Sequence, residues 1–357
     1  MKIVEVITHL NAGGAQNLCV NLCEQFVKQG HDVSLIVLFD GGQERYLRTI
    51  ANNPKIHYFS LHKKKGFSFK ISRRLFEIID KIHPDVIHTH LASIGYLCAD
   101  HRFSKYTIFH TVHTLPKREL HWPYRLLLKL RISQNWSLQL IGISTKISEL
   151  ERFLYPKGQI ITIFNGFKAW SLPNDQIKQY QLISVGRFET VKNYPFMTSV
   201  LSNVKKAIPT VKMIIVGDGP ERMLVRQESE RLGLENNLEL PGQLSNPADY
   251  LQKSSLFVLC SKAEGNPISV LEAMFAGLPI VAPNVGGLPD IVPEDCGILY
   301  EPGSSSLEIA EIIKDLLQQP KEISRLGKNA HAFSLKFEIA NTSKQYLLLF
   351  EKESHQK

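Results

Sequence analysis

The alternation of two sequence patterns restricts the fold of this 357-residue chain more than any other feature. Short apolar runs rich in β-branched residues are typical of buried strands, and the longer stretches between them have helical periodicity. This order predicts parallel α/β units. In the first half we expect strands near residues 2–8, 32–38, 55–59, 85–88, 107–112, 139–143 and 160–163, and helices near 14–29, 69–82, 91–102, 122–134 and 145–154.

The same alternation starts again after a polar stretch at residues 171–176. Strands are expected near 181–186, 211–216, 238–240, 256–259, 279–282 and 297–300, helices near 194–207, 220–232, 247–253, 268–276 and 306–317, and a helical segment with one apolar face at 320–351. The chain is therefore predicted to form two doubly wound, Rossmann-like α/β domains. We place them at 1–170 and 180–334, with a linker at 171–179 and a C-terminal helix at 335–357.

Charge and cysteine content limit the classes of function. A net charge of +8 favours polyanionic ligands or surfaces. No aromatic-interleaved nucleic-acid motif accompanies the charge, so a membrane surface is preferred to nucleic acid. No apolar run reaches the ~18–20 residues of a spanning helix, and the N-terminus does not read as a signal peptide. The five cysteines include no C-x-x-C pair, which predicts buried thiols in a cytoplasmic protein and no metal site.

Ligands of open parallel sheets bind beyond the carboxyl ends of strands, so residues that directly follow strands are the candidates. Gly13 and Gly14 lie between the first strand and the first helix, where backbone amides can approach an anion. A tight turn without a ligand explains them equally well. The absence of G-x-G-x-x-G disfavours nicotinamide or flavin binding.

Histidines gather at two strands of the first half. His113 ends a strand and can donate to a hydroxyl or phosphate, whereas His110 lies inside that strand and is expected to be a core residue. His88 and His90 follow another apolar run, and for them a core position is again the preferred interpretation.

Two segments of the second half carry charges suited to an activated ligand. Arg187 and Lys192 stand five residues apart between a strand-end glycine and a helix, an arrangement that suits a pyrophosphate. A solvated loop with an Arg187–Glu189 ion pair is the alternative. Glu264 lies in a loop and Glu272 eight residues later, with Pro267 at the expected first helical position. The two carboxylates can therefore grip different parts of one extended ligand, while the 216–222 segment is mainly expected to be a turn.

Taken together, these motifs resemble retaining glycosyltransferases of family 4, including bacterial capsular and exopolysaccharide enzymes. The resemblance covers nearly the whole chain, and its most specific part is the spacing of Glu264 and Glu272 with Arg187 and Lys192. The Gly13–Gly14 loop, His113 and the Asn165–Gly166 turn follow in the family order. Such proteins have the GT-B fold, in which two Rossmann-like domains face each other across a cleft and the C-terminal helix returns to the first domain.

The resemblance also implies a role for each site residue. The first domain would hold the acceptor, and the second the nucleotide sugar. Arg187 and Lys192 would bind the diphosphate, Glu272 the ribose and Glu264 the donor sugar. Backbone amides near the Glu264 loop would meet a phosphate, the Gly13–Gly14 loop would close over it, and His113 would touch the transferred sugar. The donor-binding residues implied are Gly13, Gly14, Arg187, Lys192, Glu264, Gly265, Asn266, Pro267, Ile268 and Glu272, of which Arg187, Lys192 and Glu264 would also be catalytic together with His113.

The implied reaction is transfer of a hexosyl or N-acetylhexosaminyl group with retention, without a metal ion or cofactor, from a UDP-sugar in preference to a GDP-sugar. The acceptor would be a glycan or lipid-linked hydroxyl in surface polysaccharide synthesis. Many relatives carry an acid where this chain has Gln16, so Gln16 receives less weight than the glycines. The basic, aromatic stretch 117–131 suggests peripheral contact with an anionic membrane, and a core-packed helix with a solvated basic face is the alternative.

Other functions remain compatible with these residues. A sugar-nucleotide epimerase or hydrolase of the same fold would act without an acceptor. A catalytically idle partner of a true transferase would bind the donor without turnover. A nucleic-acid-binding protein is suggested by charge alone.

Overall fold

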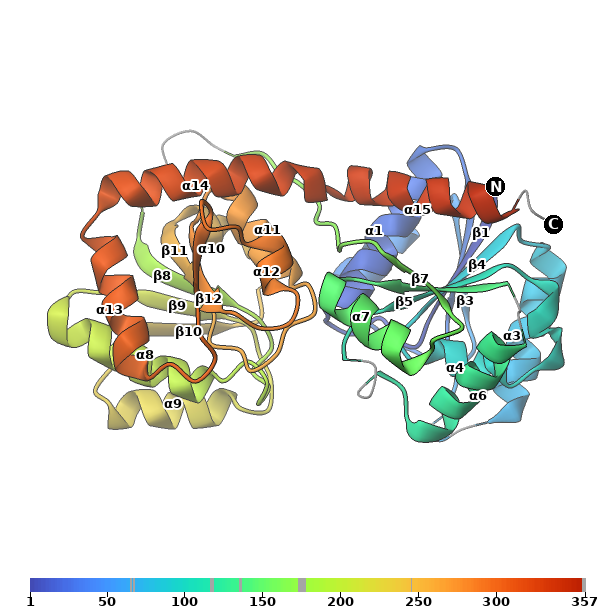
Figure 1. Ribbon diagram of the computed structural model, residues 1–357, viewed down its shortest axis with the longest axis horizontal. Coiled ribbons are helices and arrows are strands. Elements are labelled where there is room, and N and C mark those ends of the chain that lie inside the picture. Colours follow the sequence, from blue (N-terminus) through green and yellow to red (C-terminus); the bar gives the residue numbers. More distant parts are fainter. Residues whose placement is uncertain are drawn as a thin grey trace. The chain divides into compact units, whose positions relative to one another are not determined.

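The computed structural model describes residues 1–64, 66, 68–115, 119–134, 137–172, 178–244 and 246–354. The chain divides into two compact units, one made of Met1–Lys168 with Phe337–Lys357 and the other of Ala169–Lys336 (Figure 1). Most of the expected linker, residues 173–177, lies outside the described residues. Within the described part of the chain, no helix combines the length and apolar character that crossing a bilayer requires.

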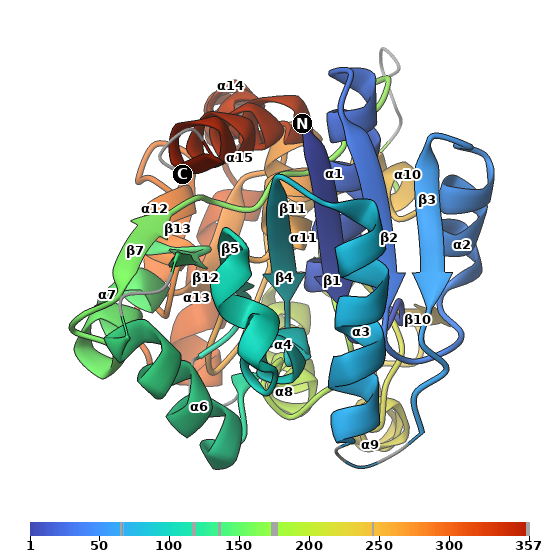
Figure 2. The same ribbon diagram turned by 90° about the vertical axis from the view of Figure 1, so that its right-hand side faces the viewer.

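A seven-stranded parallel sheet forms the centre of the first unit, in the order β3-β2-β1-β4-β5-β6-β7 (Figure 2). Its strands are β1 (Lys2–Ile7), β2 (Asp32–Val37), β3 (Ile56–Ser60), β4 (Val86–His90), β5 (Ile108–Val112), β6 (Leu138–Gly142) and β7 (Gln159–Thr162). Its helices are α1 (Gly14–Lys28), α2 (Glu44–Ala51), α3 (Phe69–Ile82), α4 (Ser93–Cys98), α6 (Trp122–Ser133), α7 (Thr145–Leu154) and α15 (Ile339–Ser354). The expected strands are all present, and the helix expected at 91–102 is α4 followed by a 3-10 segment, His101–Lys105.

Side-chain alternation along β1 divides the core of this unit into two layers. Ile3 and Ile7 face α1 and α15, whereas Val4 and Val6 face the layer that contains α3, α4 and α6. Figure 2 shows α3 and α4 in front of the strands, on the face opposite α1. Glu5 lies in the middle of this apolar strand and is fully buried.

The second unit contains a six-stranded parallel sheet in the order β10-β9-β8-β11-β12-β13. Its strands are β8 (Tyr180–Val185), β9 (Met213–Val216), β10 (Leu238–Gly242), β11 (Ser254–Val258), β12 (Ile280–Pro283) and β13 (Gly297–Tyr300). Its helices are α8 (Tyr194–Ala207), α9 (Arg222–Arg231), α10 (Ala248–Gln252), α11 (Ile268–Phe275), α12 (Leu288–Ile291), α13 (Ser306–Leu317) and α14 (Pro320–Ser334). The core of this unit is separate and is built around the side chains of β8, β9, β11, α8 and α13.

The last helical segment is interrupted by a short 3-10 turn, Leu335–Phe337, and its final helix α15 packs on the first unit. The Phe350 ring centroid lies 4.6 Å from that of Phe109 and 5.9 Å from that of Phe26. Gly166 permits the approach of α15, because a Cβ there would lie 2.7 Å from the Thr342 hydroxyl. The prediction of two Rossmann-like domains with a returning C-terminal helix is confirmed.

Candidate active site

The order of strands in the second unit brings two of the predicted segments to one edge of the sheet. Strands β8 and β11 are neighbours, and the chain builds the sheet outward in opposite directions from them. Ligand crevices of open α/β sheets lie at the carboxyl ends of strands at such a switch point. Lys192 follows β8 and Glu264 follows β11, so the topology places both at this position.

Backbone contacts hold four strand-end loops together at this edge. Hydrogen bonds run from Gly186 N to Val216 O (3.0 Å), from Phe188 N to Asp218 O (3.0 Å), from Lys262 N to Val191 O (2.8 Å) and from Gly287 N to Glu264 O (3.2 Å). Two of the contacts require glycine. A Cβ on Gly217 (φ +145°) would lie 1.9 Å from the Gly186 oxygen, and one on Gly286 (φ +60°) would lie 1.8 Å from the Glu264 oxygen. The 216–222 segment, expected mainly to be a turn, therefore packs against the loop that carries Arg187.

Lys192 and Glu264 form a direct ion pair at the centre of this cluster. The Lys192 Nζ lies 2.6 Å from the Glu264 Oε1, and the two side chains are 17% and 7% exposed. A poorly hydrated pair of this kind is strongly coupled, because removing one partner leaves an uncompensated buried charge. The Lys192 ammonium has three N–H donors, so it can bind a further acceptor beside Glu264.

Arg187 is more exposed than Lys192. Its guanidinium Nη1 lies 3.3 Å from the Glu189 Oε1, and both side chains are about half exposed. This is the surface ion pair that the sequence left open as an alternative. The guanidinium has five N–H donors, so this ion pair does not prevent Arg187 from meeting another acceptor.

The α11 helix supplies the remaining predicted donor residues of the second unit. It begins at Ile268 with Pro267 as its N-cap, so Pro267 precedes the helix instead of occupying its expected first position. Gly265 and the buried Asn266 lie in the loop before it. Glu272 is half-buried and lies four residues into the helix, about 6 Å along its axis from Ile268. The helix N-terminus and Glu272 therefore offer an anion site and a carboxylate on one short element.

The Gly13–Gly14 loop of the first unit begins helix α1. Gly13 is the N-cap of this helix, and no acidic residue lies in its first turn, so no negative charge of that turn opposes an anion. Gln16 folds back over Gly13, because a Cβ at Gly13 would lie 2.3 Å from the Gln16 Oε1. The Gln16 amide nitrogen also lies 3.1 Å from the His9 Nδ1.

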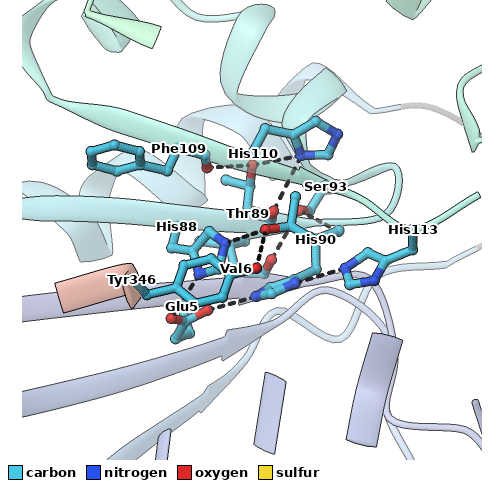
Figure 3. A network of polar contacts seen from close by, with 11 residues as sticks. Glu5, Val6, His88, Thr89, His90, Ser93, Phe109, His110, His113 and Tyr346 are labelled. Atoms are coloured by element: carbon cyan, nitrogen blue, oxygen red, sulfur yellow. Dashed lines mark hydrogen bonds and ion pairs between the residues drawn. The ribbon is translucent and has the colours of Figure 1, made fainter. Parts of the chain in front are cut away.

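His113 directly follows β5 and is joined to a buried polar network (Figure 3). Its Nε2 lies 2.9 Å from the His90 Nδ1, and the His90 Nε2 lies 2.7 Å from Glu5. The other Glu5 oxygen lies 3.0 Å from the His88 Nδ1. Burial lowers the pKa of His113 well below its ordinary value, and that of His90 to about 4, so both rings are neutral near pH 7.

His88, His90 and His110 are buried side chains within β4 and β5, as expected for core histidines. The Nδ1 of His110 lies 2.9 Å from the Thr89 hydroxyl. Glu5, which joins His88 to His90, was not identified as a site residue from the sequence. Glu5 could have been noticed as the acid within an otherwise apolar strand, because a buried carboxylate needs polar partners.

Glu5, Cys19 and His90 are close enough to hold a metal ion, but their bonding favours a different explanation. Both Glu5 oxygens already accept hydrogen bonds from histidines. Burial also raises the pKa of the Cys19 thiol well above its ordinary value, which disfavours the thiolate that a metal requires. We therefore assign this cluster to the hydrogen-bond network.

Models of two protein families match successive parts of the chain. "Glycosyltransferase Family 4" matches residues 12–169, and "Glycosyl transferases group 1" matches residues 172–333. The Staphylococcus aureus capsular polysaccharide biosynthesis glycosyltransferase CapH is 25% identical over 91% of this chain and 93% of its own length.

Solved structures share the whole architecture. Sucrose-phosphate synthase from Thermosynechococcus elongatus aligns over 100% of both chains with a TM-score of 0.82 and 18% identity. Anabaena Alr3699/HepE in complex with UDP covers 99% of this chain and 100% of its own, with a TM-score of 0.78 and 18% identity. Because the two family models together account for both units and the fold agrees, the chain is a glycosyltransferase of family 4 with the GT-B fold.

Proposed function

We propose that this glycosyltransferase moves a hexosyl or N-acetylhexosaminyl group from a UDP-sugar to a hydroxyl of a glycan or lipid-linked acceptor, with retention of configuration. The pathway is assembly of a surface polysaccharide on the cytoplasmic side of the membrane. The similarity to CapH supports the pathway, and the UDP bound to the Anabaena protein supports the nucleotide. The ion pair of Lys192 and Glu264 at the sheet's switch point is the observation that carries the proposal.

In this proposal, charge stabilisation of the leaving diphosphate supplies most of the catalysis. Lys192 and Arg187 neutralise the diphosphate and provide the positive charge that a metal ion supplies in other transferases. Glu264 accepts hydrogen bonds from hydroxyls of the donor sugar, and Glu272 accepts those of the ribose. The amides of residues 265–268 and of the Gly13–Gly14 loop bind phosphate oxygens.

Replacement of either member of the ion pair tests these roles. We expect Lys192→Ala and Glu264→Ala each to lower kcat by about 10²–10³-fold, because each removes a group that meets developing charge or the reacting sugar. Turnover is measured with a radiolabelled UDP-sugar, selected by a thermal-shift screen of nucleotide sugars. Lys262→Ala is the matched control, since Lys262 is exposed on the same loop as Glu264.

Stability must be measured beside activity, because each single replacement leaves a buried charge alone. A folded Lys192→Ala variant with wild-type kcat would remove the proposed role. Release of free sugar or an epimer from donor alone would instead support the epimerase or hydrolase alternative.

We also propose that helix α6 meets an anionic lipid surface. Trp122, Leu126 and Leu130 recur at helical spacing and are 70%, 52% and 50% exposed, and the exposed Lys129 lies on the same face. The opposite side of the helix buries Leu128 and Ile132, so α6 packs in the core while presenting an apolar and basic face outward.

The basic stretch expected at 117–131 is described from Glu119 onward. Lys117 and Arg118 lie outside the described residues. The guanidinium of Arg131 donates to the Cys98 carbonyl at 2.9 Å and is thus used within the fold. Arg131 therefore does not contribute to the proposed lipid-facing surface, whereas the exposed Lys129 does.

Co-sedimentation with phosphatidylglycerol vesicles tests the contact. We expect the wild-type protein to bind at low salt, and Trp122→Ser/Leu126→Ser to bind about tenfold more weakly, because each side chain contributes apolar burial in the interface. Met223→Ser is the control, since Met223 is 63% exposed on α9 of the other unit. Absence of wild-type binding, or equal loss in the control, would refute the proposal.

A further inference from the structure

Glu5 is the branching point of the buried network in the first unit (Figure 3). One arm runs from its Oε2 to His90 and on to His113, with contacts of 2.7 and 2.9 Å. The other arm runs from its Oε1 to His88 at 3.0 Å, and from His88 to the Thr111 hydroxyl at 2.8 Å. The second arm ends at the Tyr346 hydroxyl on α15, 3.0 Å from Thr111.

The pairing of the strands produces this network. Glu5 on β1 lies opposite His88 on β4, and His90 lies opposite Thr111 on β5. Side chains two residues apart share a face of a sheet, so His90 and His88 point to the same side. His113, two residues beyond Thr111, continues this row past the end of β5.

The hydrogen bonds determine which ring nitrogen of each histidine carries the proton. Burial alone would raise the pKa of Glu5, but contacts with His88 and His90 lower it to about 2, so the carboxylate only accepts hydrogen bonds. His90 must then donate through Nε2, which leaves its Nδ1 as an acceptor because the ring is neutral. His113 therefore donates through Nε2, and its own Nδ1 carries the lone pair.

The Nδ1 of His113 is buried and has no hydrogen-bond partner among the residues that the structure describes. Leaving a buried acceptor without a partner is unfavourable, and a ligand that donates a hydrogen bond would recover that cost. A neutral nitrogen in this state can accept from a hydroxyl but cannot donate. The network therefore specifies that a partner of this nitrogen must donate a hydrogen bond.

We propose that Glu5 and His90 are positioning residues that hold His113 in a single tautomer, with Nδ1 directed at a hydroxyl of the transferred sugar. The inference rests on the proposed function in so far as the hydroxyl belongs to a sugar. The arm through His88 and Thr111 has a different task, because it joins the sheet to α15 and does not reach His113.

The tautomer can be measured by nitrogen NMR of the full-length protein with labelled histidine. His113 is assigned by the signals that disappear in His113→Gln. The expected result is a protonated Nε2 and a non-protonated Nδ1. Adding the UDP-sugar substrate should shift the Nδ1 signal without protonating it, whereas UDP alone should not. A protonated Nδ1 in the free protein, or no shift with the sugar nucleotide, would overturn the proposal.

Two variants test the positioning role independently of each other. We expect Glu5→Met and His90→Leu to abolish the single tautomer of His113 and to lower kcat about 10–100-fold, the usual cost of losing an outer-shell partner. UDP affinity should stay within about twofold, because neither Glu5 nor His90 makes a proposed nucleotide contact. If a folded variant no longer holds His113 in a single tautomer and its kcat is unchanged, the inference is wrong.

Tyr346→Phe is the matched control, since it removes the hydroxyl at the end of the other arm. It should lower stability while leaving the His113 tautomer and kcat unchanged, and an equal loss of kcat would mean that the whole network is structural. If the wild-type protein transfers no sugar from any donor, the proposed function fails. In that case the NMR measurement on the free protein still tests whether Glu5 and His90 fix the tautomer of His113.

Discussion

Two buried acids beside the His113 loop are held in their neutral form. Burial raises the pKa of both Glu119 and Glu151 to about 8. The Glu119 Oε2 accepts hydrogen bonds from the backbone nitrogens of His113 (2.6 Å) and Thr114 (3.0 Å), and its Oε1 lies 3.6 Å from the His110 Nε2. Glu151 lies on α7, and its Oε2 has no hydrogen-bond partner among the described residues.

Glu151 is expected to make stability fall as pH rises. The folded acid keeps its proton up to about pH 8, whereas the unfolded acid loses it near its ordinary pKa of 4.5. Unfolding therefore releases a proton between these values, so the free energy of unfolding decreases across this range. Glu151→Gln should remove this dependence and raise stability at pH 8 by a few kcal/mol.

Denaturant unfolding between pH 6 and 9 measures the difference. The control is Glu149→Gln on the same helix, where the carboxylate is exposed and 3.6 Å from the Lys146 ammonium. If the free energies of unfolding of Glu151→Gln and of the wild type change in parallel with pH, the proton released on unfolding does not come from Glu151.

The sequence was enough to predict those candidate site residues that lie directly after a strand. Lys192, Glu264 and His113 each follow a strand, and local periodicity locates strand ends. Their partners could not be identified in this way, because the contacts depend on strand order. Glu264 lies 72 residues from Lys192, and Glu5 lies 85 residues from His90. An acid in an apolar strand signals that a partner exists without saying where.

At the scale of elements, periodicity predicted the strands well and the short helices poorly. Helix α2 was missed because its eight residues bury only Tyr46 and Ile50, too few positions to establish a helical pattern. Helix α12 has only four residues. The final helical segment was expected to be continuous, but its 3-10 turn lies where the chain passes from the second unit to the first.

The α15 helix is expected to contribute strongly to the stability of the first unit. Phe350 is fully buried against Phe26 and Phe109, so Phe350→Ala should cost about 3–5 kcal/mol by leaving a cavity. Leu348→Ala is the control on the same helix, since Leu348 is 68% exposed. Thermal unfolding measures the loss of stability, and hydrogen exchange should locate that loss in the first unit. Equal, small effects of both variants would mean that α15 is only loosely docked.

At the scale of the whole molecule, the repeated α/β pattern was enough to predict two doubly wound sheets. The family models support the same reading by matching each half separately. The sequence does not give strand order. Periodicity shows which face of a helix or strand is buried, but not which strands lie next to each other. The switch point of the second sheet, and with it the pairing of Lys192 with Glu264, depends on that order.

The first unit is built from both ends of the chain, while the second is continuous. During translation the first sheet therefore leaves the ribosome without α15, and the side chains of Phe26 and Phe109 that contact Phe350 stay uncovered. At cellular rates of about 5–20 residues per second, making residues 169–350 takes roughly 10–40 s. The second unit can fold within that interval. Until α15 has been made, the core of the first unit is therefore incomplete, and a chain that stops before Ile339 is expected to leave it so.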